Sequence, residues 1–430
     1  MNLTVIIVSY NVRHFLEQCL KSVIRASNIL DVDIFVVDNG SEDDTVEMVQ
    51  ALFPQVTLIV NLDNRGFSKA NNQAIRQSES DYILLLNPDT VIEETTLIRI
   101  LGFMENHPET GGLGIKMIDG KGHFLPESKR GLPTPWASFC KMSHLSQLFP
   151  RSEFFNRYYL GFLSENKINK VEVLAGAFML LRRKVLDEIG LLDEDFFMYG
   201  EDIDLSFRIT QAGYINYYFP ESRMIHYKGE STRKSSLNYV RLFYGAMLIF
   251  ARKHFVGKNK LLLSLVILPG VYFRALIAVI YRLLNYISHF SIVSFFSQHK
   301  LRKHDNAINR VVLIIGNKSE SQKIKDLLDL DSAGRLTTFS VLVNNSIRDP
   351  VFSFEIVNGK SLIKYIEDQI EQNHPAEIVF SASDLTTDQI ITLMVLLKNY
   401  SIPFRIAHTD INTIIGTNFV ITHPDVKASA

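Results

Sequence analysis

Residues 33–41 read Asp-Ile-Phe-Val-Val-Asp-Asn-Gly-Ser, an apolar run that ends in a polar cluster. The same arrangement occurs at residues 4–11, where Thr-Val-Ile-Ile-Val precedes Ser-Tyr-Asn, and at residues 82–89, where Tyr-Ile-Leu-Leu-Leu precedes Asn-Pro-Asp. Short apolar runs of this kind are typical of buried strands. Helical patterns separate them, which predicts parallel strands joined by crossover helices and therefore an α/β domain.

The elements expected in the first hundred residues alternate regularly. The predicted strands are Thr4–Ser9, Asp33–Asp38, Val56–Val60 and Tyr82–Leu86, and the predicted helices are Val12–Ala26, Asp43–Leu52 and Ser68–Gln77. In open α/β sheets, ligands bind outside the carboxyl ends of the strands. Three polar clusters fall at three such ends, so we expect a binding site there.

Composition restricts the class of protein. A chain of 430 residues with 47% hydrophobic residues is expected to form two or three domains with large cores. The two cysteines, Cys19 and Cys140, give no disulfide framework and no thiolate metal site, which fits a reducing cytoplasm. The N-terminus reads as a first strand and lacks the pattern of a signal peptide.

Residues 223–310 carry fifteen Lys or Arg against two acids, although the net charge of the whole chain is −1. Within this block, residues 261–281 are mostly apolar and about long enough to cross a bilayer, but Pro269-Gly270 and Arg274 interrupt them. A helix over residues 270–296 would place its polar residues along one face, which favours a helix lying in the membrane interface. A membrane span, a re-entrant hairpin and a soluble docking helix remain alternatives. We therefore expect attachment to a membrane surface, peripheral or through a single membrane segment.

A second α/β pattern begins near residue 310. The predicted strands are Val311–Ile315, Ser340–Val343, Glu377–Ser381 and Phe404–Ala407, and the predicted helices are Lys318–Leu328, Leu362–Glu371 and Thr387–Leu397. The first strand ends in Gly316-Asn-Lys-Ser, which lacks a full Gly-x-Gly-x-x-Gly fingerprint, so dinucleotide binding is disfavoured. The expected organisation is a domain at 1–255, a membrane-associated helical segment at 256–305 and a smaller Rossmann-like α/β domain at 306–430.

Two of the strand-end segments have features of a nucleotide site. The carboxylate of Asp38 could accept a hydrogen bond from the N–H of uracil or thymine; the alternative is a turn whose Ser41 caps the next helix. Residues 64–72, Asn-Arg-Gly-Phe-Ser-Lys-Ala-Asn-Asn, start a helix after a strand, and the N-terminus of a helix suits a diphosphate. A capped surface helix is the alternative. The other candidates for nucleotide-sugar binding at these strand ends are Ser9, Tyr10, Asn11 and Asn39.

Asp89 is a candidate metal ligand because it follows a buried strand through Asn87-Pro88. Mg²⁺ and Mn²⁺ accept one or two protein oxygens and take the remaining ligands from water and substrate phosphates. A β-turn is the alternative for Asn-Pro-Asp. His226 could be a supplementary ligand for Mn²⁺, although a lone histidine is more often structural.

Residues 200–204, Gly-Glu-Asp-Ile-Asp, place three acids at the start of a predicted helix, Ile203–Ala212. Acids in a first turn complement the helix dipole, so helix capping is one interpretation. A general base that deprotonates an acceptor hydroxyl is the other. Different acids of the segment can serve both roles.

The ordered set of motifs resembles that of family 2 glycosyltransferases. In chain order the motifs are Val-Ser-Tyr-Asn, Val-Asp-Asn-Gly-Ser, Asn-x-Gly-Phe-x-x-Ala-Asn-Asn, Leu-Asn-Pro-Asp, Gly-Ala-Phe-Met, Gly-Glu-Asp-x-Asp and His-x-x-Gly-x-Ser. The similarity covers residues 1–255, and the nearest branch looks like the rhamnosyltransferase-type enzymes of bacterial cell-surface polysaccharide assembly. It implies a GT-A fold, inverting chemistry, a nucleoside-diphosphate sugar donor and a divalent cation, Mg²⁺ or Mn²⁺.

The resemblance assigns a role to each matching position. Asp202 would be the base, with Glu201 next in line, and Asp89 would bind the metal with help from His226. Asp38 would read the base of the donor, and the remaining positions of the nucleotide-sugar pocket would be Gly66, Phe67, Asn71, Asn87 and Gly176. Many relatives have Asp-x-Asp where this chain has Asn87-Pro-Asp89, so the metal should depend more on the donor diphosphate.

These features predict an enzyme that adds a single sugar from a UDP- or dTDP-sugar to a polyprenyl-linked or polysaccharide acceptor. The Gln-x-x-Arg-Trp segment of processive relatives is absent after Asp202. A non-catalytic nucleotide-sugar-binding scaffold is the alternative; a nucleic-acid binder is disfavoured by the high apolar content and the dispersed basic residues. Residues 310–420 weakly resemble the Rossmann-like domain that precedes the catalytic part of some polyprenyl-phosphate sugar transferases, which implies a regulatory or docking role.

Overall fold

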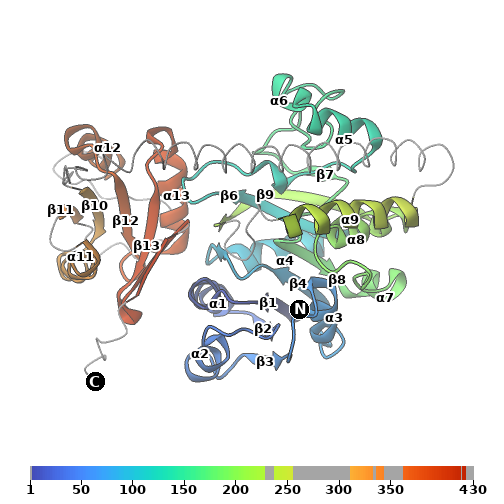
Figure 1. Cartoon of the computed structure of the whole chain (residues 1–430), viewed down its shortest axis with the longest axis horizontal. Helices are drawn as coiled ribbons and strands as arrows, with labels where there is room; N and C mark the ends of the chain where they lie inside the picture. Colours follow the sequence, from blue (N-terminus) through green and yellow to red (C-terminus); the bar gives the residue numbers. More distant parts are fainter. Residues whose placement is uncertain are drawn as a thin grey trace, which may run out of the picture.

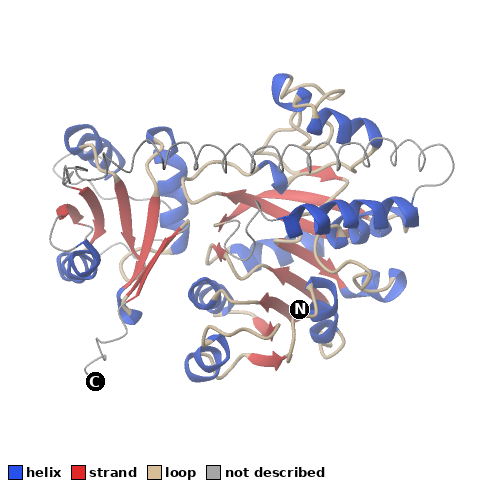
Figure 2. Cartoon of the chain, in the orientation of Figure 1, coloured by secondary structure: helices blue, strands red, loops and turns tan. Residues whose placement is uncertain are grey.

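The computed structural model describes residues 2–227, 237–254, 310–332, 336–342, 362–417 and 419–422. Their strands form two separate sheets, each with helices packed on it (Figures 1 and 2). The predicted membrane-associated segment, 256–305, lies outside the described residues. Among the residues that are described, no helix combines the length and the apolar character needed to cross a membrane.

The larger sheet has the strand order β3-β2-β1-β4-β8-β6-β9-β5, with β7 paired to β9. Its strands are β1 (Asn2–Ser9), β2 (Asp31–Asp38), β3 (Thr57–Val60), β4 (Tyr82–Leu86), β5 (Thr90–Ile92), β6 (Thr110–Ile118), β7 (Asn169–Val171), β8 (Phe178–Arg182) and β9 (Ile215–His226). The accompanying helices are α1 (Arg13–Ser27), α2 (Thr45–Leu52), α3 (Phe67–Ile75), α4 (Thr96–Asn106), α5 (Pro135–Met142), α6 (Leu145–Leu148), α7 (Arg183–Ile189), α8 (Glu201–Gln211) and α9 (Leu237–His254), with a 3₁₀ turn at Pro126–Ser128.

The register of the central strands brings the predicted polar clusters together. β1 runs parallel to β2 and β4, with Ser9 opposite Asp38 and Ile7 opposite Leu86. The residues that follow β1, β2 and β4 therefore emerge at one edge of the sheet. This arrangement confirms the expected α/β alternation, with element ends shifted by only a few residues.

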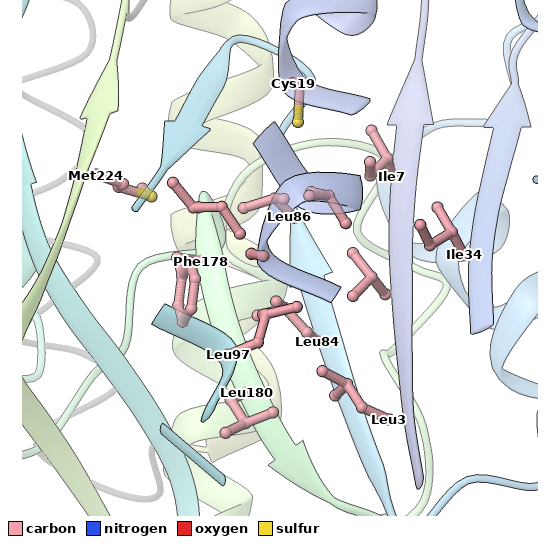
Figure 3. Close-up of a cluster of buried hydrophobic side chains, with 14 of the residues drawn as sticks. Leu3, Ile7, Cys19, Ile34, Leu84, Leu86, Leu97, Phe178, Leu180 and Met224 are labelled. Atoms are coloured by element: carbon pink, nitrogen blue, oxygen red, sulfur yellow. The ribbon is translucent and has the colours of Figure 1, made fainter. Parts of the chain in front are cut away.

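Apolar side chains from β1, β4 and β8 form a core between the sheet and the helices on one of its faces. Figure 3 shows Leu3 and Ile7 beside Leu84, Leu86, Phe178 and Leu180, with Leu97 of α4 and Cys19 of α1 against them. All five residues of β4 are buried. Burial on both faces explains why this strand reads as a continuous apolar run.

The apolar run at residues 173–181 is a strand only in its second half. Residues 173–177 form a loop, and β8 begins at Phe178. The reason is that α8 supplies hydrogen-bond acceptors to this backbone: Leu174 N donates to Ser206 Oγ at 3.1 Å, and Gly176 N to Asp202 Oδ2 at 3.3 Å. At Leu174 and Gly176, side chains of α8 therefore accept the backbone hydrogen bonds that a neighbouring strand would otherwise accept.

The smaller sheet has the strand order β11-β10-β12-β13-β14-β15. Its elements are β10 (Arg310–Gly316), α11 (Lys318–Ser332), β11 (Leu336–Leu342), α12 (Leu362–Asn373), β12 (Glu377–Ser381), α13 (Thr387–Leu397), β13 (Phe404–His408), β14 (Thr413–Gly416) and β15 (Phe419–Thr422), with 3₁₀ turns at Lys398–Tyr400 and Thr409–Ile411. The strands β11, β10, β12 and β13 are parallel, as the sequence predicts, whereas the antiparallel hairpin β14–β15 was not predicted. The carboxylate of Asp384 accepts hydrogen bonds from Asn317 N and Nδ2, so an acid already occupies the start of α11.

The two units are joined by reciprocal capping of two helices. Glu94, just before α4, accepts hydrogen bonds from Thr387 N at 2.6 Å and Asp388 N at 3.0 Å, at the start of α13. Asp388 in turn accepts from Glu94 N at 2.9 Å and from Thr95 Oγ1 at 3.1 Å. Each helix N-terminus therefore receives a carboxylate from the other unit.

A buried ion pair lies beside these caps. Glu93 is fully buried, and Arg223 of β9 contacts its Oε1 through Nη2 at 2.5 Å. The same guanidinium donates to Thr392 Oγ1 of α13 at 2.9 Å. Arg223 therefore neutralises a buried charge and reaches the second unit at the same time.

Replacing Arg223 by Met should lower the free energy of unfolding by about 3–5 kcal/mol, because Glu93 would remain buried without its cation. A urea titration measures the change. Arg76→Met is the matched control: its ion pair with Glu194 is exposed, with side chains 58% and 37% accessible, and should contribute less than about 1 kcal/mol. Equal losses in the two variants would contradict this account.

Candidate active site

A cavity of about 280 Å³ lies at the edge of the larger sheet where β1, β2 and β4 end. Ten of the predicted site residues line it: Ser9, Tyr10, Asn39, Gly66, Phe67, Asn87, Gly176, Glu201, Asp202 and His226. Further lining residues that the sequence did not single out include Asn64, Met117, Glu127, Arg130, Met198 and Tyr199. Segments far apart in the chain thus meet in one cavity.

Three predicted nucleotide-site residues do not line this cavity. Asn11 is exposed, and its side chain accepts from Glu42 N at 2.8 Å. Asn71 is buried in α3 and donates to Phe67 O at 2.9 Å. Asp38 is fully buried, and its Oδ2 accepts from Gly40 N at 3.1 Å and Ser41 N at 2.9 Å, as expected for a turn. The expected capping by Ser41 is wrong, because the N-cap residue of α2 is Asp44 and Ser41 Oγ accepts from Asn11 N. Oδ1 of Asp38 has no hydrogen-bond partner among the described residues, so one acceptor remains for a ligand.

Asp202 projects toward the cavity from the first turn of α8 and is hydrogen-bonded on both oxygens. Oδ1 accepts from Ile203 N at 2.8 Å, and Oδ2 accepts from Gly176 N at 3.3 Å and from Arg130 Nη2. The guanidinium of Arg130 is an adjacent cation with a rigid array of donors. These contacts fix the orientation of the carboxylate.

Glu201 precedes Asp202 but has a different environment. Burial and, next, the negative charge of Asp202 raise the pKa of Glu201 to about 8. Its Oε2 is buried without a hydrogen-bond partner among the described residues. At pH 7 Glu201 is therefore mostly neutral and poorly suited to accept a proton, which leaves Asp202 as the candidate base.

Arg130 is the main functional candidate that the sequence reasoning missed. Burial opposes its charge, but the carboxylate of Asp202 and the side chain of Tyr158 together outweigh that effect and raise the pKa of Arg130 above its usual range. Its Nη2 also donates to Leu174 O at 2.6 Å, and its guanidinium is hydrogen-bonded to Tyr158. The only signal in the sequence was a pair of cations, Lys129-Arg130, in an irregular segment of prolines and aromatics.

Asp89 and His226 lie next to each other, but only His226 lines the cavity, because Asp89 is buried just behind Asn87 and Pro88. Thr90 of β5 pairs with His226 of β9, and the two facing atoms, Asp89 Oδ1 and His226 Nε2, are 3.4 Å apart. Asp89 Oδ1 is buried and has no hydrogen-bond partner among the described residues. An orphaned carboxylate oxygen facing an imidazole nitrogen fits a divalent cation. Within the described ranges no cluster of three or more potential ligands occurs, so water and the donor would have to supply the rest.

Gly66 packs against the loop before α8. Phe67 N donates to Phe197 O at 2.8 Å, and Gly66 has φ +81°. A Cβ on Gly66 would lie 2.4 Å from Phe197 O. We expected this glycine to allow approach of a diphosphate, but its closest neighbour is the backbone of the loop that leads to Glu201 and Asp202.

The cavity combines a charged, oriented carboxylate with a pair of metal-compatible side chains. Asp202 can remove a proton from a hydroxyl group, and Asp89 with His226 can hold a cation near a phosphate. Asn and Gly residues at the strand ends leave room and hydrogen-bond donors between them. The chemistry that such a site supports is nucleophilic displacement of a phosphate leaving group.

Comparison with known proteins identifies the class. Residues 4–190 match the model of the family described as Glycosyl transferase family 2. Residues 4–190 form a family 2 glycosyltransferase domain.

Relatives of this glycosyltransferase include enzymes named for rhamnosyl transfer. The N-acetylglucosaminyl-diphospho-decaprenol L-rhamnosyltransferase of Mycobacterium tuberculosis is 28% identical over 259 residues, which is 58% of this chain and 83% of that protein. Rhamnosyltransferase WbbL of Escherichia coli is 28% identical over 183 residues, 39% of this chain and 63% of that protein. The poly-beta-1,6-N-acetyl-D-glucosamine synthase of Staphylococcus aureus is 25% identical over 221 residues, 51% of this chain and 48% of that protein. Among solved structures, a mannosyltransferase from Pyrobaculum calidifontis matches with a TM-score of 0.42 at 16% identity, covering 69% of this chain and 81% of that chain.

Gly66→Ala should destabilise the glycosyltransferase more than Gly213→Ala. Both glycines have positive φ, +81° and +89°, so each alanine incurs about 1–2 kcal/mol of backbone strain. Only at Gly66 would the new Cβ also collide with Phe197, which should add about 1–3 kcal/mol, because open space surrounds Gly213. Urea titrations of the two variants make the comparison, and equal losses would show that the Gly66–Phe197 contact is not tight.

Proposed function

We propose that the protein is an inverting, non-processive glycosyltransferase that moves one sugar from a UDP- or dTDP-sugar to a hydroxyl of a lipid-linked or cell-surface saccharide. The observation that carries the proposal is the placement of Asp202, hydrogen-bonded on both oxygens, in a cavity lined by the strand-end motifs. A single oriented base and an anion-compatible pocket are what a one-step displacement requires.

In the proposed reaction, Asp202 accepts the proton of the acceptor hydroxyl. The acceptor oxygen attacks the anomeric carbon of the donor from the face opposite the diphosphate, and the bond between that carbon and the phosphate oxygen breaks. The products are the glycosylated acceptor and a nucleoside diphosphate. One displacement inverts the anomeric centre. Arg130 holds Asp202 in position through its guanidinium.

Asp89 and His226 would hold the divalent cation, Mg²⁺ or Mn²⁺. The orphaned Oδ1 of Asp89 and its 3.4 Å separation from His226 Nε2 support this assignment. A cation bound there would stabilise the negative charge that develops on the departing diphosphate. Asn87 and Pro88, which line the cavity just before Asp89, keep this segment at its wall.

The donor nucleotide would lie along the ends of β1 and β2 and the start of α3. The unpaired Oδ1 of Asp38 supports recognition of the N–H of uracil or thymine, although Asp38 would have to be reached beyond the lining of the present cavity. The relatives' names support the acceptor class: one names a diphospho-decaprenol-linked acceptor, and two name rhamnosyl transfer. A lipid-linked acceptor places the reaction at the cytoplasmic face of a bacterial inner membrane, where the protein would be peripheral or held by a single membrane segment.

Asp202→Asn should reduce transfer at least about 10²–10⁴-fold, because the amide cannot accept a proton. Binding of the nucleoside diphosphate should persist in this variant, as measured by calorimetry. Glu201→Gln is the matched comparison and should cause a much smaller loss at pH 7, because Glu201 is already neutral below about pH 8. A greater loss of transfer in Glu201→Gln than in Asp202→Asn would show that Glu201, and not Asp202, is the base.

Asp89→Asn should weaken Mn²⁺-dependent binding of UDP or dTDP at least tenfold, since it removes the carboxylate ligand. Binding measured in EDTA should not change, which separates loss of the metal from damage to the pocket. His226→Gln should have a smaller effect in the same calorimetric titration. An unaltered Mn²⁺ dependence in Asp89→Asn would rule out this metal site.

A further inference from the structure

Residues 131–157, here called the aromatic lobe, carry a cluster of exposed aromatic side chains. Trp136 and Phe139 lie on α5, Phe149 follows α6, and Phe154 lies in the segment after it. Their side chains are between 40% and 63% exposed. Figure 1 shows α5 and α6 at the top of the molecule, outside the helices that cover the larger sheet. Contiguous exposed apolar surface of this kind marks an interaction site.

The rings contact one another, so the cluster has a defined arrangement. The centroid of Trp136 lies 5.6 Å from that of Phe139 and 4.9 Å from that of Phe154, and Phe149 stacks on Phe155 at 4.8 Å. The indole N–H of Trp136 donates to Phe154 O at 2.9 Å. This hydrogen bond connects α5 to the segment after α6, and it satisfies the one hydrogen-bond donor of the indole.

The start of α5 fixes the orientation of these rings. Thr134 caps the helix by accepting a hydrogen bond from Ala137 N at 3.3 Å, and Pro135 occupies the first helical position. Proline there is pre-organised for a helix. Trp136 and Phe139 are three residues apart and therefore share one face of α5.

The charge of the lobe is positive. Three of its residues, Lys141, Arg151 and Arg157, carry cationic side chains, and Glu153 is its only acid. Arg157 is paired with Glu153 and Glu172, and Lys141 lies over the ring of Tyr158, so Arg151 is the exposed cation of the lobe outside these contacts. Exposed aromatic rings with a cation beside them match the interface of a bilayer that contains anionic phospholipids. There the rings insert at the level of the headgroups and the cation attracts a lipid phosphate.

The base of the lobe is attached to the active site. Gly131 N donates to Tyr158 O at 3.0 Å, which closes the lobe at its two ends. Arg130, the residue before the lobe, is hydrogen-bonded to both Tyr158 and Asp202. The lobe is therefore anchored at the residue that orients Asp202.

We propose that the aromatic lobe is a membrane-docking surface that inserts Trp136, Phe139, Phe149 and Phe154 into the interface of an anionic phospholipid bilayer. The inference is drawn from the exposed rings and the charge of the lobe. It rests on the proposed function in one respect, since a lipid-linked acceptor would be located in such a membrane. It is independent of residues 256–305. Docking would bring the acceptor headgroup to the cavity while the catalytic unit stays outside the hydrocarbon.

The chain contains a single tryptophan, so its intrinsic fluorescence reports on the lobe alone. Vesicles of mixed phosphatidylcholine and phosphatidylglycerol should shift the emission of the full chain to shorter wavelength, and brominated acyl chains should quench it. Vesicles of phosphatidylcholine alone should bind more weakly. Co-sedimentation with vesicles but an unchanged emission would overturn the proposal, because another surface would then make the contact. A failure to bind vesicles would also overturn it.

A double variant, Phe139→Ser with Phe154→Ser, keeps the tryptophan and should lower vesicle partitioning about tenfold or more. Ile29→Ser is the matched control, because Ile29 is 76% exposed on the loop between α1 and β2, and it should partition like the unaltered chain. Turnover of a water-soluble acceptor should be equal in all three proteins, so a failure of the proposed transferase activity is recognised separately. An emission shift that depends on protein concentration without vesicles, with a doubled mass in light scattering, would instead indicate pairing of two copies and would contradict membrane docking.

Discussion

The pairing of β5 with β9 is the constraint on which the arrangement of the molecule depends. β5 begins one residue after Asp89, and its register sets Thr90 opposite His226. Tyr227 N also donates to Asp89 O at 3.0 Å, so backbone hydrogen bonds place the two candidate metal ligands before any ion binds. Arg223, on the same strand as His226, neutralises the buried Glu93 just after β5 and reaches α13. The short β5–β9 pair therefore carries the proposed metal site and also joins the two α/β units. It gives the second unit a physical link to the active site.

The other determinant of the site is the unequal treatment of two neighbouring carboxyl groups. Glu201 and Asp202 both belong to the first turn of α8, where acids complement the helix dipole. Capping and catalysis were competing interpretations of this segment, and the structure separates the residues by environment. Glu201 is buried and favours its neutral form, whereas Asp202 receives hydrogen bonds from two backbone N–H groups and a guanidinium. The proximity of the two acids strengthens this division, because both cannot easily be charged at once.

The sequence predicts those parts of the fold and site that depend on local periodicity and on the polar residues at strand ends. The apolar runs before Ser9, Asp38 and Asn87 locate β1, β2 and β4, and parallel pairing then requires their ends to meet. The contacts that the sequence could not reveal are between segments without periodicity. Arg130 comes from an irregular stretch, and its pairing with Asp202 requires the lobe to fold back on α8. Gly66 lines the cavity, and its close neighbour is Phe197, 131 positions along the chain, a contact that no local pattern indicates. Its place in the donor pocket stays a prediction. Glu93 and Glu94 resemble ordinary surface acids, and only the docking of α13 explains why they are buried or capped.

The central claim is that this cavity transfers a single sugar from a nucleoside-diphosphate sugar. The most direct test incubates the full chain and Mn²⁺ with a panel of UDP- and dTDP-sugars and a polyprenyl-diphosphate-linked N-acetylglucosamine acceptor, followed by mass spectrometry of acceptor and nucleotide. The account predicts that, with one donor, the acceptor gains the mass of one sugar residue and no more, with release of an equal amount of nucleoside diphosphate. Binding of these nucleotides without consumption of any donor, or extension of the acceptor into a polymer, would contradict it.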